Sequence, residues 1–377
     1  MDFEQLNDDS SERLVEKLHR FAQWWGYPEI APYPFSQTPT PTTFPPRCIS
    51  LWSVSDVVVA GSAKAQTSAM PARNRTWASC CLLAMSLAFT TVAGCTSEPA
   101  ADDKPLAGPV LTAAPGPSLL QAMKERGVVR IGVKFDVPLF GLKDPATGKF
   151  SGFDIEIAKG IVSRLYPEAE DITKHIEFVE ALSKNREKFL TDRSVDMIIS
   201  TYTINAARKE LVDFAGPYYI AGQDILARKT DVDNGVITGI GDVNGKKVCS
   251  VTGSTSLNNL RDAAPNVDVS ITKDKYSECF VALTSGLVQA MSTDDVILLG
   301  LAQGFPQFVV TGNPFHTEPY GIGIPKGDEE LRAFVNDALE KMFADGMWDR
   351  AFRDTIGTTG TPAPAPPTLD RYIRPSA

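Results

Sequence analysis

An arginine that follows an apolar run offers a binding group for a carboxylate. Arg208 comes shortly after the run VDMIIS, and the segment between them contains Thr201 and Thr203. A guanidinium in such a loop can hold a carboxylate through two parallel hydrogen bonds, a geometry that lysine cannot reproduce. The alternative is a surface arginine that forms a salt bridge with a nearby carboxylate, either Glu210 or Asp213.

A second set of polar residues follows two later strand-like segments. Ser254 and Thr255 follow a glycine at the expected start of a helix, where free N–H groups and the helix dipole favour an anion. Ordinary N-capping is the alternative, and both roles are compatible. Asp294, or the adjacent Asp295, follows the apolar segment that ends near Ser292 and could pair with a ligand ammonium.

The elements that must position these residues alternate between strands and helices. Apolar runs predict strands at 128–133, 176–179, 195–200, 247–251, 288–292 and 320–325. Helical periodicity and end signals predict helices at 118–127, 153–165, 186–190, 254–262, 278–285 and 328–344. Continuous apolar strands between amphipathic helices indicate an α/β fold with parallel sheets covered on both faces.

The pattern occurs twice, which predicts two α/β lobes joined by two extended crossings. We expect lobe 1 at 118–220 plus 318–357 and lobe 2 at 221–317, with hinges near 219–227 and 309–319. Ligands of such folds bind in the crevice where strand ends and helix N-termini converge.

Charge and composition exclude several classes of function. A formal charge of −9 over 377 residues argues against a nucleic-acid partner, which requires a basic face. The three histidines show no metal-ligand spacing with cysteine, so we expect no metal and no cofactor. Cys249 and Cys279 are the two cysteines of the expected folded body, and outside the cytoplasm they would form a disulfide. Two buried free thiols are the alternative.

The export signal begins at Met70. A basic start, an apolar stretch at 80–89 and a small-residue site are typical of a secretory signal peptide at 70–94. The last residues, Val92 to Cys95, resemble the lipobox of bacterial lipoproteins. That resemblance implies that Cys95 carries a lipid anchor at the outer face of the cytoplasmic membrane, in the cell envelope.

Three segments are expected to lie outside the folded body. Residues 1–69 precede the signal and are either a disordered extension or an untranslated stretch. Residues 95–117 read as a flexible tether, and residues 358–377 as a disordered proline-rich tail, because their composition offers little apolar surface to bury.

The motifs of the folded body, taken together, resemble one family. They are GFDIEIAKGI at 152–161, DMIISTYTINAARKELVDFAGPYY at 196–219, TGSTS at 252–256 and STDD at 292–295. In this order they resemble the bacterial extracellular solute-binding proteins for polar amino acids (family 3), above all the glutamate/aspartate-binding lipoproteins of ABC transporters. The resemblance implies a type II periplasmic-binding-protein-like fold with the ligand cleft between two lobes.

The resemblance also assigns roles to individual residues. It implies that Arg208, with Thr201 and Thr203, binds an α-carboxylate, and that Ser254 and Thr255 contact the ligand from lobe 2. It selects Asp294 over Asp295 as the acceptor of the ligand ammonium.

Three further positions bear on the ligand side chain. Lys134 and Arg186 match basic positions of glutamate/aspartate-binding members, and Tyr276 matches a polar aromatic position of the same pocket. Two cations beyond Arg208 suit a second ligand carboxylate, so glutamate or aspartate is expected, with glutamine as an alternative. Solvated surface charges are the other interpretation of Lys134 and Arg186.

The expected function is therefore capture of an acidic amino acid by lobe closure and its delivery to an ABC permease and ATPase. We expect a monomer that is not an enzyme and does not bind nucleic acid. Two alternatives are a dehydratase-like enzyme on the same scaffold, with Asp294, His316 or Glu318 as the acid or base, and a receptor sensor domain.

Overall fold

The computed structural model describes residues 118–371, which contain one nine-stranded sheet and one three-stranded sheet. The expected leader, the anchor cysteine Cys95, the tether and the remaining N-terminal cysteines lie outside these residues. Within 118–371, no helix has the length and apolar character that a membrane span requires.

Lobe 1 comprises the elements before the middle of strand β7 and those after the middle of strand β12. Its helices are α2 (Leu119–Arg126), α3 (Phe153–Leu165), α4 (Arg186–Thr191), α5 (Ala206–Leu211), α10 (Glu329–Ala344) and α11 (Met347–Asp354). Its strands are β1 (Val129–Val133), β2 (Asp136–Val137), β3 (Gly141–Lys143), β4 (Phe150–Ser151), β5 (Ile176–Glu180) and β6 (Met197–Ile198). Its 3-10 turns are η1 (Ile172–His175), η2 (Ser183–Asn185) and η4 (Ile356–Thr359).

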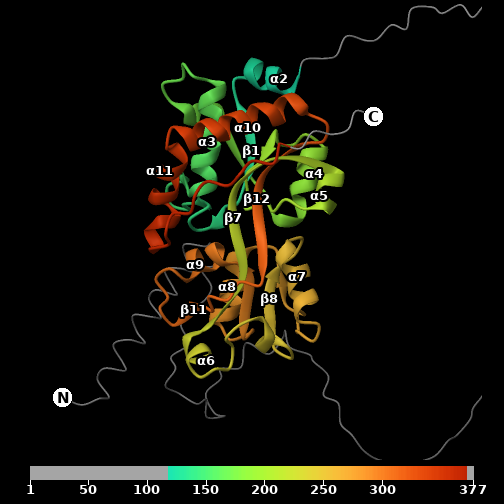
Figure 1. Cartoon of the computed structure of the whole chain (residues 1–377), viewed down its shortest axis with the longest axis vertical. Coiled ribbons are helices and arrows are strands. Elements are labelled where there is room, and N and C mark those ends of the chain that lie inside the picture. Colours follow the sequence, from blue (N-terminus) through green and yellow to red (C-terminus); the bar gives the residue numbers. More distant parts are fainter. Residues whose placement is uncertain (1–117, 372–377) are drawn as a thin grey trace, which may run out of the picture. The chain divides into compact units, whose positions relative to one another are not determined.

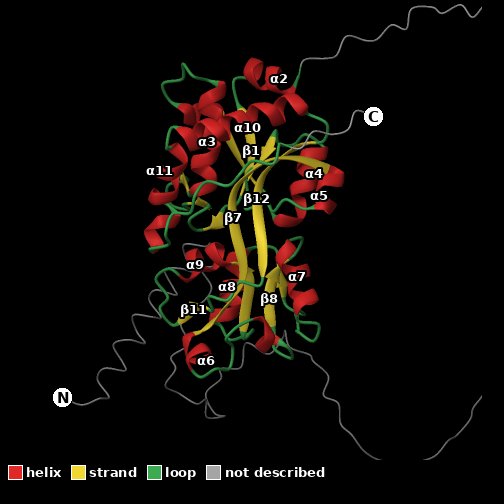
Figure 2. Ribbon diagram, in the orientation of Figure 1, coloured by secondary structure: helices red, strands yellow, loops and turns green. Residues whose placement is uncertain are grey.

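Lobe 2 comprises the elements between β7 (Val212–Arg228) and β12 (His316–Pro325). Its helices are α6 (Lys229–Asp233), α7 (Thr255–Ala263), α8 (Tyr276–Thr284) and α9 (Asp295–Ala302), with the 3-10 turn η3 (Ile240–Val243). Its strands are β8 (Val248–Val251), β9 (Thr272–Lys273), β10 (Ala290–Asp294) and β11 (Phe308–Val310). Figure 2 shows helices around the strands of each lobe.

The strand order, β5-β1-β6-β12-β7-β10-β8-β9, explains how the lobes are connected. β1 pairs in parallel with β5 and β6, and β8 pairs in parallel with β9 and β10. The long strands β7 and β12 pair antiparallel to each other and run from one lobe into the other, side by side (Figure 1). The chain therefore crosses between the lobes along two paired strands.

Apolar side chains at helical spacing anchor the C-terminal helices on lobe 1. On α10, Leu331, Val335, Ala338, Leu339 and Met342 are buried, and Phe334, which helical periodicity places on the same face, is half-buried. Trp348 of α11 is fully buried and its Nε1 donates to the carbonyl of Tyr218 at 2.8 Å. This packing holds the returning chain against α3 and β7.

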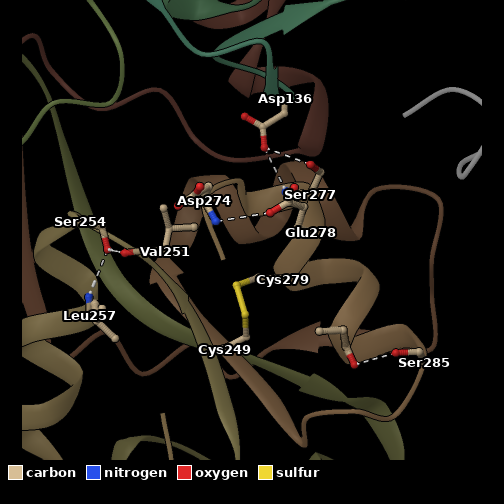
Figure 3. The surroundings of a disulfide bond; sticks show 11 residues. Asp136, Cys249, Val251, Ser254, Leu257, Asp274, Ser277, Glu278, Cys279 and Ser285 are labelled. Atoms are coloured by element: carbon tan, nitrogen blue, oxygen red, sulfur yellow. Dashed lines mark hydrogen bonds between the residues drawn. A yellow bond between two sulfur atoms is a disulfide. The ribbon is translucent and has the colours of Figure 1, made fainter. Parts of the chain in front are cut away.

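A disulfide joins Cys249 of β8 to Cys279 of α8 inside lobe 2 (Figure 3). It is the pair expected from the sequence, and both residues are fully buried. The bond fixes α8 against β8, and α8 begins at a residue expected to line the ligand site, Tyr276.

Two strands, β6 and β12, differ from their predicted lengths by several residues, whereas the bounds of the other predicted strands differ by one or two. The run VDMIIS contributes only Met197–Ile198 to the sheet, because the residues after Ile198 turn away into the loop that carries Thr201. β12 begins at His316 rather than at residue 320, because the polar residues before Tyr320 pair with β7 in the crossing.

The prediction of a disordered tail from residue 358 is wrong up to residue 371. The segment runs along lobe 1, where the Asp370 N–H donates to the carbonyl of Gly216 at 2.7 Å. Arg371 pairs with two carboxylates of α10, Asp337 and Glu340, at 2.8 Å each. Composition alone misses this arrangement, because the partners lie on other elements.

Candidate ligand site

The loop between β6 and α5 has a strained backbone at Thr201. Thr201 has φ +43°, a conformation that is unfavourable for a β-branched residue. Its N–H donates to a carboxylate oxygen of Asp154, on α3, at 2.9 Å, which holds the backbone in this conformation. Its hydroxyl is buried and has no hydrogen-bond partner among the described residues. Strain together with an unsatisfied buried hydroxyl is typical of a functional position.

Arg208 is buried at this loop rather than exposed on the surface. Its Nη1 donates to the carbonyl of Thr203 at 2.7 Å, and its Nε lies 3.2 Å from Glu187. The surface salt bridge considered from the sequence, with Glu210 or Asp213, is therefore replaced by an ion pair with Glu187. Burial, and then the charge of Arg186, lower the pKa of Arg208 to about 10.

Arg186 and Arg208 both lie against the ring of Tyr202. Their guanidinium carbons are 4.3 Å and 4.8 Å from the ring centroid. Arg186 is buried, and its Nη1 donates to the carbonyls of Ser200 and Thr201 at 3.0 Å and 3.2 Å. The aromatic ring thus helps to hold two guanidinium groups of like charge close together.

Lys134 at the end of β1 is the third buried cation. Its Nζ donates to the carbonyl of Ala181 at 3.0 Å and to the hydroxyl of Ser183 at 2.8 Å. Burial, followed by the charge of Arg186, lowers the pKa of Lys134 to about 7. The interpretation of Lys134 and Arg186 as solvated surface charges is therefore wrong.

Lobe 2 contributes Tyr276 and the first residues of α7 to the same region. The Lys134 ammonium lies 5.6 Å from the ring centroid of Tyr276. The hydroxyl oxygens of Thr203 and Thr255 are 3.4 Å apart, so the Thr203 loop of lobe 1 contacts the start of α7 in lobe 2. Ser254 acts as the N-cap of α7, since its Oγ accepts from the Leu257 N–H at 3.2 Å and donates to a backbone carbonyl of β8.

Asp294 is the acidic group of the site on lobe 2. It is buried, and its Oδ2 accepts the hydroxyl of Tyr320, on β12, at 2.5 Å. Burial, and then the nearby charge of Glu318, raise the pKa of Asp294 to about 8. Asp295 points elsewhere, because its Oδ1 accepts the N–H groups of Gly222 and Val296.

Glu318 of β12 lies between the lobes and is completely buried. Its Oε2 accepts the hydroxyls of Thr203 at 2.6 Å and Thr255 at 2.8 Å. Its Oε1 lies 2.7 Å from Nδ2 of Asn259, on α7, and 2.8 Å from Nδ1 of His316. One carboxylate therefore contacts both lobes.

The structure thus brings all nine residues expected at the ligand site to the facing sides of the two lobes. They are Lys134, Arg186, Thr201, Thr203 and Arg208 of lobe 1 and Ser254, Thr255, Tyr276 and Asp294 of lobe 2. Sequence reasoning gave no role in the site to Asp154 or Tyr202, although both lie inside quoted motifs. It weighed Glu318 only as a catalytic group of an enzyme.

Comparisons with known proteins identify the family of the chain. Residues 129–358 match the model of the bacterial extracellular solute-binding proteins, family 3. A Bacillus subtilis protein named ABC transporter glutamine-binding protein GlnH is 40% identical over 237 residues, which cover 63% of this chain and 84% of that protein. The glutamate-binding protein GluB of Corynebacterium efficiens is 39% identical over 279 residues, which cover 71% of this chain and 92% of GluB.

Solved structures show the same fold. A solute receptor for L-cysteine of Neisseria gonorrhoeae has a TM-score of 0.59 at 31% identity, over 64% of this chain and 94% of the receptor. An ancestral arginine-binding protein bound to glutamine has a TM-score of 0.56 at 36% identity, over 62% of this chain and 99% of that protein. The chain has the type II fold of periplasmic amino-acid-binding proteins and belongs to the bacterial extracellular solute-binding proteins, family 3.

Proposed function

We propose that this protein captures an acidic amino acid, foremost L-glutamate, and delivers it to an ABC permease. The observation that carries the proposal concerns Lys134 and Arg186. Both are buried, and both donate hydrogen bonds only to neutral oxygens, with no carboxylate at ion-pairing distance among the described residues. Buried cations without an anion are unfavourable, and a ligand carboxylate would compensate their charge.

The other site residues account for the backbone groups of an amino acid. Arg208, with the free hydroxyl of Thr201 and the backbone N–H of Thr203, would hold the α-carboxylate on lobe 1. Thr255 and Ser254 would approach from lobe 2 at the start of α7, and Asp294 would accept the ammonium. Tyr276 would line the side-chain pocket beside Lys134. The second carboxylate of the ligand would then lie between Lys134 and Arg186.

Glutamine is the competing ligand, because an amide oxygen can also accept hydrogen bonds from cations. The relatives divide between the two: GlnH is named for glutamine and GluB for glutamate. The buried basic groups favour glutamate, since a carboxylate compensates the charge of Arg186 and stabilises the protonated form of Lys134, whereas an amide does neither.

Calorimetric titration of the protein with glutamate, aspartate, glutamine, arginine and histidine tests the proposal. We expect the tightest binding for glutamate, and a larger loss for glutamate than for glutamine in Arg186→Ala. Lys188→Ala is the matched control, because the Lys188 side chain is 73% exposed. Tightest binding of a neutral or basic amino acid would contradict the side-chain pocket, and no binding at all would contradict the function.

We further propose export and lipid anchoring through Cys95, and binding by lobe closure as a monomer. The sequence around Cys95 supports the anchor, and the family supports export and partnership with an ABC permease and ATPase. In cell fractionation, Cys95→Ser should move the protein from the membrane fraction to the soluble fraction. Unchanged membrane attachment would contradict the anchor.

Two observations favour the enzyme alternative. Asp294 keeps a raised pKa, as a general acid requires. An ancestral amino-acid-binding protein described as a precursor of cyclohexadienyl dehydratase is 32% identical, with a TM-score of 0.56. The binding proposal is preferred because the partners of Asp294 suit an acceptor for a ligand ammonium. Product formation from a cyclohexadienyl carboxylic acid would reverse this preference.

A further inference from the structure

The contacts between the lobes include ion pairs at the rim and hydrogen bonds in the interior. At the rim, Lys184 pairs with Asp274 at 2.5 Å, and both side chains are more than 40% exposed. In the interior, the buried Asp136 of lobe 1 accepts the N–H and the hydroxyl of Ser277, on lobe 2, at 3.1 Å each. Exposed pairs of this kind contribute little and weaken with salt. In the interior, the fully buried Glu318 receives hydrogen bonds from both lobes through a single oxygen. Hydrogen bonds to a buried charge are considerably stronger than exposed ion pairs.

The position of Glu318 in the fold matters for closure. Glu318 lies on β12 where this strand crosses between the lobes, opposite Ala221 of β7. Thr203 belongs to lobe 1, and Thr255 belongs to α7 of lobe 2. Opening of the cleft moves Thr203 away from Thr255, so the shared oxygen can keep at most one of the two hydroxyls.

The same hydrogen bonds fix the direction of both hydroxyls. A threonine hydroxyl has one proton, and those of Thr203 and Thr255 are donated to Glu318. The two oxygens then retain only lone pairs for a ligand. In the shut state they can accept from a ligand ammonium but cannot donate to a ligand carboxylate.

We propose that Glu318 is a positioning residue that latches the cleft: it holds the Thr203 and Thr255 hydroxyls together when the lobes close and orients them toward a ligand ammonium. The inference rests on the closure mechanism of the proposed function, but not on the identity of the ligand. The hydrogen bonds to Glu318 supply part of the free energy of closure whether or not a ligand is bound. The ligand then has to supply less of that free energy, so its affinity rises.

The test measures closure without ligand. Fluorescent labels on non-natural residues at Leu211 in lobe 1 and Leu287 in lobe 2 avoid the six cysteines, and both positions are more than half exposed. Single-molecule energy transfer in the full chain then gives the closed-to-open ratio. We expect Glu318→Gln and Thr255→Val each to lower this ratio roughly tenfold, since each removes hydrogen bonds to a buried charge. In the double variant the Thr255→Val effect should vanish, because its acceptor is already altered.

Asp224→Asn is the matched control. Asp224 is also a buried carboxylate of a crossing strand, but it accepts from Thr311 and Ile225 within lobe 2. Its replacement should destabilise the fold without changing the closed-to-open ratio by more than about twofold, because no bond between the lobes is lost.

The dissociation rates of L-glutamate and L-glutamine give a second readout, which applies even if the free protein is rarely closed. A latch requires faster release of whichever amino acid binds, roughly tenfold in Glu318→Gln. Release at the wild-type rate together with an unchanged closed-to-open ratio would overturn the latch, as would fully additive effects of the two substitutions. Binding of glutamine but not glutamate would contradict the proposed ligand and leave the latch intact.

Discussion

Glutamate and glutamine should exchange different numbers of protons with this site. Without ligand, Lys134 has a pKa of about 7 and Asp294 a pKa of about 8, both shifted chiefly by burial. A ligand ammonium beside Asp294 lowers the pKa of Asp294, so binding of either ligand releases a proton. A second carboxylate beside Lys134 raises the pKa of Lys134, so glutamate, but not glutamine, also causes proton uptake.

The magnitude follows from the two pKa values. At pH 7.5 Lys134 is about one quarter charged and Asp294 about three quarters protonated. Full protonation of Lys134 therefore takes up about 0.75 proton, and full ionisation of Asp294 releases about 0.75 proton. Glutamate binding should therefore exchange close to zero net protons, and glutamine binding should release about 0.75 proton.

The pH dependence of affinity has a definite sign for each ligand. Uptake weakens binding as the pH rises above the pKa of Lys134, whereas release strengthens binding as the pH rises toward the pKa of Asp294. Between pH 7 and 8 the glutamate affinity should change less than about twofold, while the glutamine affinity should rise about fivefold.

Titration calorimetry in phosphate and in Tris measures the proton number, because these buffers differ in ionisation enthalpy. In Lys134→Met, glutamate should release about 0.75 proton as glutamine does, since the group that takes up a proton is absent. Lys188→Met, at an exposed site, should leave both proton numbers unchanged. Equal proton numbers for the two ligands in the wild type, or no change in Lys134→Met, would refute the placement of the second carboxylate beside Lys134.

Three further predictions concern the site, the disulfide and the tail. Arg208→Lys should weaken amino-acid binding at least about thirtyfold in calorimetry, because lysine cannot form the two-point contact; an unchanged dissociation constant would contradict the role of Arg208. Replacing Cys249 and Cys279 by serine should lower the free energy of unfolding by about 3 to 4 kcal/mol in urea titrations, given a sequence separation of 30, and a loss under about 1 kcal/mol would contradict that constraint. Deleting residues 361–377 should lower the free energy of unfolding by about 1 to 2 kcal/mol in the same titration, because it removes the exposed ion pairs of Arg371 and the half-buried Leu369. Unchanged stability would mean that the tail does not pack against lobe 1.

The sequence predicted the α/β fold, and it singled out residues from both lobes that the structure brings near one another. Arg208 and Thr201 stand after an apolar strand, and loops at strand ends converge on the crevice in such folds. The strand–helix alternation gave the order of elements, because buried strands and amphipathic helices have different periods.

The interactions that span long sequence distances were not predictable. Thr203 and Glu318 are 115 residues apart, and no periodic pattern connects them. The partner of Arg208 was also missed: Glu187 becomes its neighbour only when α4 and α5 pack together. The tail was misjudged for the same reason, since Arg371 finds its carboxylates on α10.

A crystal structure of the protein grown with saturating L-glutamate tests the central claim most directly. The account predicts the side-chain carboxylate of glutamate within hydrogen-bond distance of both Lys134 and Arg186, with the α-carboxylate on Arg208 and the ammonium on Asp294. A glutamate whose side-chain carboxylate contacts neither Lys134 nor Arg186, or an empty site at saturating glutamate, would contradict it.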